Sequence, residues 1–254
     1  MSNLLYRLYE RSLVRELVPE DLPHHVAVML DGNRRWAKTR GSQNPKEGHE
    51  AGALKIFEFL GWCDDIGIPV VTLYLLSTDN LKNRNASELQ DLLGIITDVA
   101  DEMAFQQKWR IHVMGDRELL PENIAAKLDE AQAKAAGLHD KPMVNLAVGY
   151  GGRKEIADAM RSILKAHADQ GTTIEQLAEV LDPDLISEHL YTSGQPDPDL
   201  IIRTSGEQRM SGFLLWQSAS SELYFEEALW PDFRKVDFLR ALRAFEKRHR
   251  RYGA

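Results

Sequence analysis

Residues 25–36 decide the fold, and they read HVAVML followed by DGNRRW. The first six residues are rich in Val, Met and Leu, as expected of a β-strand, and the next six are mostly polar or basic. Ligands of open parallel sheets bind beyond the carboxyl ends of the strands, where loops and helix starts present free N–H groups. The stretch therefore predicts a strand that ends on a binding site.

The rest of the chain alternates short aliphatic runs with longer helix-like segments, which is the pattern of a mostly parallel sheet covered by helices. Strands are expected at 25–30, 68–76, 110–114, 143–148 and 199–203, with a further one inside 213–217 or 222–225. Helices are expected near 47–66, 86–107, 121–136, 153–169, 173–181, 184–190 and 236–249. The predicted fold class is α/β, a single domain with a central sheet of about six strands flanked by helices. The polar segment 82–87 is the loop best suited to mobility.

A chain of 254 residues suits one α/β domain, to which we assign residues 24–254. Residues 1–23 form a lead-in, in which apolar side chains recur on one face of an amphipathic helix: Leu5, Tyr9, Leu13 and Leu17. We expect this helix to dock on the body or on a partner subunit. Contact with a membrane surface stays an alternative.

The overall composition excludes several classes of protein. A net charge of -8 and a pI of about 5.5 disfavour general binding to nucleic acid or anionic lipid. Cys63 is the only cysteine, so neither an internal disulfide nor a cysteine-based zinc site can form within one chain. No apolar run reaches the length of a membrane-spanning helix, and no signal peptide is recognised. A cytoplasmic setting is expected.

Each predicted strand ends on Gly, Asn, Ser, Asp or Arg residues, in the segments 31–36, 77–80, 115–117, 149–153 and 203–207. In a parallel sheet these ends meet at one edge. Glycine lets the backbone approach an anion closely, arginine grips phosphate oxygens with a planar fork of donors, and Ser or Asn add neutral hydrogen bonds. The recurrent chemistry is the capture of a polyanion.

Asp31 stands among four cations, Arg34, Arg35, Lys38 and Arg40. Such neighbours keep a carboxylate ionised, and its useful role among phosphates is to hold a divalent cation, for which we expect Mg²⁺. Asp-Gly-Asn is also a good turn and helix cap. From this segment alone, both interpretations stay open.

Other phosphate and hydrolase motifs fail. The chain has no Gly-x-x-x-x-Gly-Lys-Ser/Thr loop, the glycines of 149–152 lack Gly-x-Gly-x-x-Gly spacing, and neither Ser77 nor Ser205 lies in a Gly-x-Ser-x-Gly elbow. Nucleotide binding and serine hydrolysis thus lose their main support. A phosphoryl-transfer or hydrolase enzyme that uses the same anion-binding edge stays a rival.

Separated motifs, in order along the chain, resemble the cis-prenyltransferases, the undecaprenyl diphosphate synthase family. They lie at 25–37, 48–49, 73–80, 149–153, 202–207 and 209–217 with 222–225. The match runs from about residue 24 to the C-terminus. The resemblance implies condensation of isopentenyl diphosphate with an allylic diphosphate, formation of a Z double bond and release of diphosphate. It also implies Mg²⁺ as cofactor and a homodimer.

The resemblance carries over residue by residue. The residues that match the allylic diphosphate cradle are Gly32, Asn33, Arg34, Arg35 and His49, with Trp36 beside them. Those that match the second-strand motif are Ser77, Thr78 and Asp79, and those that match the grip on isopentenyl diphosphate are Arg203, Arg209 and Ser211. Asp31 is implied to hold Mg²⁺, helped by Glu222 across a dimer interface. Asn80 matches a residue assigned to proton removal; a neutral amide is a poor base, so we expect it to orient or relay while a diphosphate oxygen accepts the proton.

The chain also departs from the family pattern. Asn44 stands where the family has an arginine, residues 79–81 read Asp-Asn-Leu instead of Glu-Asn-Trp, and one residue is inserted before Arg84. One diphosphate contact is therefore expected to be lost, and we assign Arg84 as the displaced arginine.

Leu75 and Leu76 replace the Ala-Phe pair of long-chain members. A leucine at position 75 adds about three methylene-sized groups, which a filled interior tolerates poorly, so the product tunnel should be short. This sequence pattern resembles that of actinobacterial short-chain Z-isoprenyl diphosphate synthases. It predicts a farnesyl-length product from geranyl diphosphate. A longer-chain decaprenyl or undecaprenyl diphosphate synthase is the alternative, and a non-catalytic prenyltransferase subunit is a weaker one.

Overall fold

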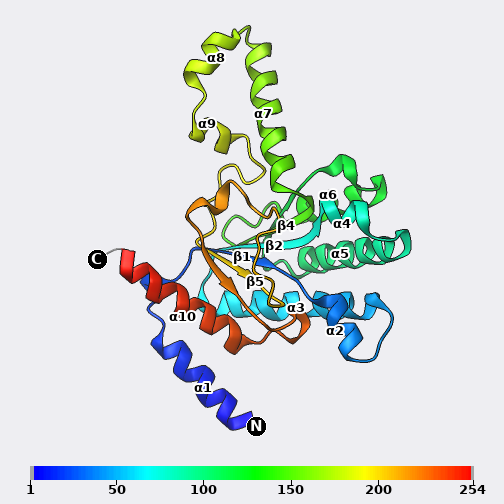
Figure 1. Cartoon of the computed structure of the whole chain (residues 1–254), viewed down its shortest axis with the longest axis vertical. Helices are drawn as coiled ribbons and strands as arrows, with labels where there is room; N and C mark the ends of the chain where they lie inside the picture. The colour runs from blue at the N-terminus through cyan, green and yellow to red at the C-terminus, as the bar shows by residue number, and fades with distance from the viewer. Residues whose placement is uncertain (1–2, 253–254) are drawn as a thin grey trace.

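The decisive stretch forms strand β1 (His25–Met29), and all five of its residues are buried. The computed structural model describes residues 3–252, and Figure 1 shows β1 within the central sheet. The strand order is β3-β4-β2-β1-β5-β6, and every neighbouring pair is parallel. The predicted α/β fold with a six-stranded parallel sheet is confirmed.

The remaining strands are β2 (Val70–Ser77), β3 (Arg110–Met114), β4 (Met143–Tyr150), β5 (Leu200–Arg203) and β6 (Glu222–Phe225). The alternative sixth strand within 213–217 is wrong. Phe213 and Leu214 lie fully buried against one face of the sheet, beside Met29 and Ala147, and Leu214 has a φ of 46°, outside the strand region. Their apolar character reflects packing on the sheet, not pairing in it.

The helices are α1 (Asn3–Glu16), α2 (Asn33–Thr39), α3 (Pro45–Ile66), α4 (Thr78–Asn83), α5 (Ala86–Gln106), α6 (Glu122–Ala135), α7 (Gly152–Asp169), α8 (Ile174–Val180), α9 (Pro183–Glu188) and α10 (Lys235–Tyr252). The seven helices predicted beyond residue 45 are found with end shifts of a few residues. The unpredicted helices α2 and α4 have 7 and 6 residues, too few for an apolar period to show.

The predicted mobile loop at 82–87 is wrong. Asn83 ends α4, Ala86 begins α5, and only Arg84 and Asn85 lie between them. The side chain of Asn85 caps α5 by accepting a hydrogen bond from Glu88 N at 2.8 Å. Asn85 thus serves helix capping and Arg84 the site described below, while the other residues of 82–87 are exposed on the two helices.

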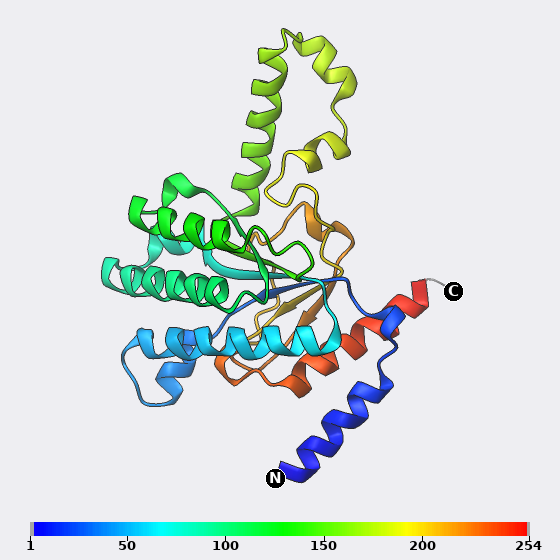
Figure 2. The ribbon, with the colours of Figure 1, turned by 180° about the vertical axis from the view of Figure 1, so that it is seen from behind.

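The two faces of the sheet are covered unequally. Helices α3, α5, α6 and α10 pack on the face that carries Val28 and Leu73, and Figure 2 shows α3, α5 and α6 stacked side by side. The face that carries Ala27 and Met29 is covered by the segment around Phe213. Figures 1 and 2 show α7, α8 and α9 projecting away from the sheet as an arm. A parallel sheet needs both faces covered, and here a short loop segment covers one of them.

Helix α1 lies against α10, but only part of the predicted apolar stripe makes contact. Leu13 is 1% exposed and Leu17 packs on the core, whereas Leu5 is 60% exposed. Steps of four residues drift around a helix by about 40° each, so a stripe chosen at that spacing leaves the packed face, which Tyr6 occupies instead. Within residues 3–252, no helix combines the length and the apolar content needed to cross a membrane.

Helix α2 packs closely on α3 at two glycines. A Cβ atom at Gly48 would lie 2.0 Å from the carbonyl oxygen of Asn33, and one at Gly52 would lie 2.5 Å from Asn33 Oδ1. These positions let α3 approach the first residue of α2. The contact fixes the start of α2 relative to the sheet, and the candidate site is built on that start.

Gly48→Ala is expected to lower the free energy of unfolding by about 2–3 kcal/mol, because the methyl group overlaps backbone that cannot shift without moving α2. Gly61→Ala in the same helix is the matched control. Its added methyl meets no atom within 4 Å, so the higher helix propensity of alanine should stabilise the protein by about 0.5–1 kcal/mol. Urea titration measures both values. Equal effects at the two positions would contradict the packing argument.

Candidate active site

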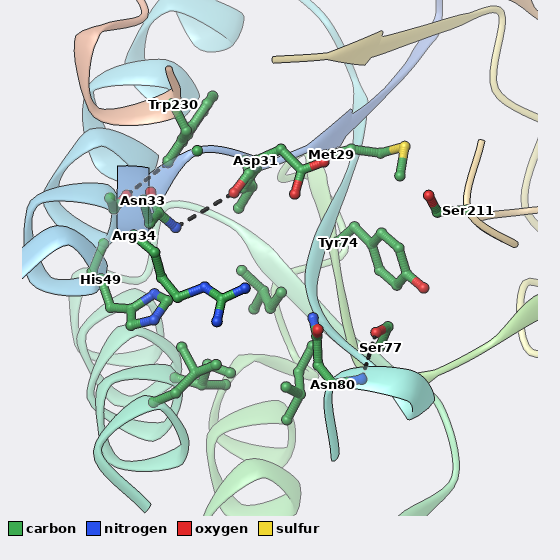
Figure 3. Close-up of a pocket in the computed structure, with 18 of the residues that line it drawn as sticks. Met29, Asp31, Asn33, Arg34, His49, Tyr74, Ser77, Asn80, Ser211 and Trp230 are labelled. Atoms are coloured by element: carbon green, nitrogen blue, oxygen red, sulfur yellow. Dashed lines mark hydrogen bonds between the residues drawn. The ribbon is translucent and has the colours of Figure 1, made fainter. Parts of the chain in front are cut away.

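A cavity of about 510 Å³ opens at the carboxyl edge of β1. It is lined by the ends of β1, β2 and β5 and by residues of α2, α3, α4 and α5. Figure 3 shows Asp31 beyond β1, Ser77 and Asn80 where β2 passes into α4, and His49 across the cavity. The volume lies in the range typical of small-molecule sites, and β1 is where the strand order changes direction.

All five strand ends lie at one edge of the parallel sheet, as predicted, but those of β3 and β4 do not line this cavity. Both strands lie on one side of the sheet, beyond β2. Gly115 serves chain packing, since a Cβ there would lie 2.1 Å from the carbonyl oxygen of Val148. Arg117 pairs with Asp129 at 3.0 Å. Close backbone approach, and not anion binding, explains these polar segments.

Asp31 is bound by Arg203 from the end of β5. The Nη2 and Nε atoms of Arg203 donate to Asp31 Oδ2 at 2.6 and 2.9 Å. The Arg203 side chain is 4% exposed and that of Asp31 43% exposed. The helix cap of α2 is Gly32, with a φ of 110° and no side-chain cap bond. Asp31 therefore acts as an ionic group facing the cavity, and the capping interpretation is wrong.

Gly32 has no replacement at this turn. A Cβ atom would lie 3.1 Å from the Cα of Leu229, and the positive φ disfavours any other residue. The turn reverses the chain at once from β1 into α2, which places Asn33, Arg34 and Arg35 at the cavity.

One group of cations lies at the end of β5 and in the loop that follows it. Arg203 Nη1 donates to Ser211 Oγ at 2.8 Å and also to the carbonyl oxygen of Arg209. Ser205 and Ser211 have φ values of 80° and 47°. Each such non-glycine residue costs about 1–3 kcal/mol and is found mainly where a ligand is held. Arg35 Nη2 donates to the carbonyl oxygen of Ser205 at 3.1 Å and so ties α2 to this loop.

The other group of cations surrounds Glu88, a residue that the sequence prediction missed. Glu88 Oε1 accepts from Arg84 Nη1 at 2.6 Å, Glu88 pairs with Arg34 at 3.9 Å, and His49 Nε2 lies 3.4 Å from Glu88 Oε1. The side chains of Arg84 and Glu88 are 13% and 9% exposed. Spacing of four residues between an arginine and a glutamate at a helix start is the sequence signal that could have revealed the pair.

His49 is neutral in this cluster. Burial, followed by the positive charge of Arg84, lowers the pKa of His49 to about 4. Arg84 Nη1 lies 3.0 Å from His49 Nε2, and because a guanidinium only donates, Nε2 must accept. The ring proton is then on Nδ1, which is buried and has no partner within the described residues. The ring of His49 lines the cavity as a neutral group.

The remaining predicted residues divide between cavity and surroundings. Ser77, Asp79, Asn80 and Arg84 line the cavity, and Ser77 Oγ caps α4 by accepting from Asn80 N at 3.0 Å. Asn44, where the family has arginine, caps α3 by accepting from Lys46 N at 3.1 Å. Its capping role explains the amide at that position.

Two predicted site residues of the first and second motifs, Trp36 and Thr78, do not line the cavity. Trp36 Nε1 donates to Asp232 at 2.9 Å outside the cavity. Thr78 faces Gly151, and a Cβ there would lie 2.7 Å from Thr78 Oγ1. Each side chain lies next in sequence to cavity-lining residues but points away from the cavity, a direction that the motif alone does not give.

Glu222 does not reach Asp31 within one chain. It begins β6 opposite Leu200, at the amino edge of the sheet, and pairs with Arg248 at 2.8 Å. No group of three His, Cys, Asp or Glu side chains suited to a metal is found among the described residues. Mg²⁺ is commonly held by one or two carboxylates together with substrate phosphates, so Asp31 fits an ion that a diphosphate also binds, whereas Glu222 of the same chain does not.

The inner end of the cavity is apolar and lies between α3 and α5. Its lining includes Ile56, Leu92, Ile95, Ile96 and Val99. Leu75 lines it as well, from a bulge in β2 where Tyr74 pairs with Ala147 and the next paired residue is Leu76. An extra residue in a strand redirects side chains near active sites.

Comparisons with known proteins were made on sequence and structure. The model of the family described as putative undecaprenyl diphosphate synthase matches residues 29–253. A (2Z,6E)-farnesyl diphosphate synthase of Thermobifida fusca is 58% identical, covering 98% of this chain and 97% of that protein. A protein with the same name from Mycolicibacterium smegmatis is 55% identical, over 98% of this chain and 95% of that one.

A solved structure of lavandulyl diphosphate synthase from Lavandula x intermedia, in complex with dimethylallyl diphosphate, is also similar. It superposes with a TM-score of 0.81 at 34% identity, over 89% of this chain and 96% of that chain.

Proposed function

Because the chain belongs to the undecaprenyl diphosphate synthase family of cis-prenyltransferases, we propose that it is a short-chain Z-isoprenyl diphosphate synthase. The reaction joins isopentenyl diphosphate to geranyl diphosphate and yields Z,E-farnesyl diphosphate. The observation that carries this proposal is one cavity with two separate cationic groups and an apolar end between α3 and α5. Two diphosphates and one short hydrocarbon tail suit that arrangement.

The allylic diphosphate binds at the group around Glu88. Arg34 and Arg84 offer guanidinium donors, His49 lines the same side as a neutral ring, and the first turn of α2 adds backbone N–H groups. The hydrocarbon tail extends from there between α3 and α5. Isopentenyl diphosphate binds at Arg203, Arg209 and Ser211 after β5.

The condensation forms a bond between C4 of isopentenyl diphosphate and C1 of the allylic substrate. The C1–O bond breaks, its electron pair leaves with diphosphate, and one proton is lost from C2 of the isopentenyl unit. Arginines on both sides stabilise the charge that develops on the leaving oxygen. Asn80, whose backbone N–H donates to Ser77 Oγ at the start of α4, orients the isopentenyl unit while a diphosphate oxygen accepts the proton.

Mg²⁺ is the proposed cofactor, held by Asp31 and substrate oxygens. When bound there it neutralises diphosphate charge and makes it a better leaving group. Asp31 would hold the metal through the carboxylate that accepts from Arg203, and Arg203 would bind the isopentenyl diphosphate. Glu222 of a second copy in a homodimer would complete the ligand set, since Glu222 of the same chain lies at the opposite edge of the sheet.

Incubation of the purified protein with labelled isopentenyl diphosphate, Mg²⁺ and either geranyl or farnesyl diphosphate tests the proposal. A product one C5 unit longer than geranyl diphosphate supports it. Phosphate release without chain growth would support the hydrolase rival. A product of ten or more C5 units would support the long-chain alternative. No turnover would support the non-catalytic subunit.

Leu75→Ala is expected to shift the product distribution to longer chains. The substitution removes about three methylene-sized groups from the apolar end of the cavity, where the growing tail stops. Chromatography of the products against prenyl standards measures their length. Leu73→Ala is the control, because Leu73 is a fully buried leucine of the same strand that does not line the cavity, and its loss should leave the product length unchanged. An unchanged product from Leu75→Ala would mean that another residue stops elongation.

A further inference from the structure

The cavity has two lobes that lie on opposite faces of the sheet. Met29 is the direct strand partner of both Tyr74 and Arg203, and partners in parallel strands direct their side chains to the same face. That face is the one packed by the segment around Phe213. The apolar end between α3 and α5 belongs to the other face, which carries Val28 and Leu73. The two lobes meet at Asp31 beyond the strand ends.

Tyr74 has a rigid support. Its ring stacks on Phe213 with centroids 4.5 Å apart and planes at 10°, and Tyr150 packs edge-on at 5.9 Å. Phe213 is fully buried and follows Ser211 by two residues. The ring is thus held in one orientation by the loop that also carries the cationic group after β5. Burial raises the pKa of Tyr74 to about 12, so its hydroxyl stays neutral.

Met29 and Tyr74 together present apolar surface beside Arg203. Both line the cavity, and Figure 3 shows them on the same side as Ser211, with Arg34 and His49 on the other side. The allylic tail does not account for this surface, because that tail lies in the other lobe. A flat aromatic ring and a flexible thioether next to an anion grip suit a small branched hydrocarbon bonded to a diphosphate.

We propose that Met29 and Tyr74 form the hydrocarbon half of the isopentenyl diphosphate site, with Phe213 holding the Tyr74 ring in place. The inference rests on the proposed function and extends it to the residues that recognise the C5 unit. Arg203, Arg209 and Ser211 bind the diphosphate, and the wall of Met29 and Tyr74 distinguishes isopentenyl diphosphate from other small polyanions. Figure 3 shows Asn80 near Tyr74 at the end of β2, so a C5 unit resting on Tyr74 would lie within reach of Asn80.

Calorimetric titration with isopentenyl diphosphate and with inorganic diphosphate, each with Mg²⁺, tests the assignment. The wild type should prefer isopentenyl diphosphate. Tyr74→Ala should weaken binding of isopentenyl diphosphate about tenfold, which is about 1.4 kcal/mol, and change the binding of inorganic diphosphate less than about twofold. Tyr74→Phe keeps the stacked ring and should retain the preference. Binding of inorganic diphosphate also shows that each variant is folded around its cationic group.

Ile95→Ala in the opposite lobe is the matched control. Ile95 is a partly buried apolar residue that lines the cavity from α5, and its loss should raise the KM of geranyl diphosphate but not that of isopentenyl diphosphate. Tyr74→Ala should do the reverse. The inference would be overturned if Tyr74→Ala kept the preference for isopentenyl diphosphate over inorganic diphosphate, or if it weakened the binding of both ligands equally. Failure of the wild type to elongate geranyl diphosphate would instead overturn the proposed function.

Discussion

Asp31→Ala is expected to lower kcat by about a thousandfold or more. Loss of about 4 kcal/mol of transition-state stabilisation corresponds to that factor, and a metal-binding carboxylate at a diphosphate supplies an effect of this size. Steady-state assays with isopentenyl and geranyl diphosphates measure it. A kcat within tenfold of the wild type would contradict the role proposed for Asp31.

The same variant also tests the ion pair with Arg203. Arg203 is 4% exposed and would lose the acceptor of two hydrogen bonds. Because Asp31 is 43% exposed and water can partly replace it, we expect a cost of about 1–2 kcal/mol in unfolding free energy. A domain of ordinary stability stays folded after such a loss, so the drop in kcat is chemical.

Asp232→Ala is the control for Asp31→Ala. Asp232 accepts hydrogen bonds from Trp36 at 2.9 Å and Arg40 at 3.3 Å, on the outside of α2. It is an acid in the same neighbourhood that does not line the cavity. Its loss should change kcat less than about threefold, because solvent-exposed pairs contribute little.

Glu88→Ala is expected to lower the free energy of unfolding by about 3 kcal/mol. Arg84 is mostly buried and would be left without its acid, and an uncompensated buried charge is costly. Inorganic diphosphate should then raise the thermal transition of the variant more than that of the wild type, since the ligand supplies the missing negative charge. Scanning calorimetry with and without diphosphate measures both effects.

Glu58→Ala provides the matched control for Glu88→Ala. Glu58 pairs with Lys55 at 2.6 Å, the same separation as Glu88 and Arg84, but its side chain is 56% exposed. The expected cost is below about 0.5 kcal/mol, because solvent screens the pair. If both glutamates cost the same, Arg84 does not depend on Glu88.

Local patterns predicted the strands well because each is a short aliphatic run bounded by turn residues. The same patterns could not distinguish strand ends that share a cavity from those that do not. The segments after β3 and β4 contain Gly, Asp and Arg like the others, yet lie beyond β2 and away from the cavity. Strand order depends on how the helices cross the sheet, which no single segment encodes.

Residue roles within one segment showed the same limit. Arg34 and Trp36 are two residues apart, but a helix turns by about 100° per residue, so only Arg34 lines the cavity. Glu88 was missed because a glutamate in a helix is ordinary by itself. Its significance arises only where α5 brings it against Arg84 and His49.

Composition and spacing by themselves predicted an α/β fold with an anion-binding site after β1, and the motifs identified the family and with it the enzyme class. Those properties are local, because strand propensity and phosphate-binding residue types are carried by short segments. The tertiary structure alone decided that Asp31 pairs with Arg203, that Glu222 lies at the far edge, and that Met29 and Tyr74 share a face. Such pairings depend on strand register and helix packing, which bring together residues distant along the chain.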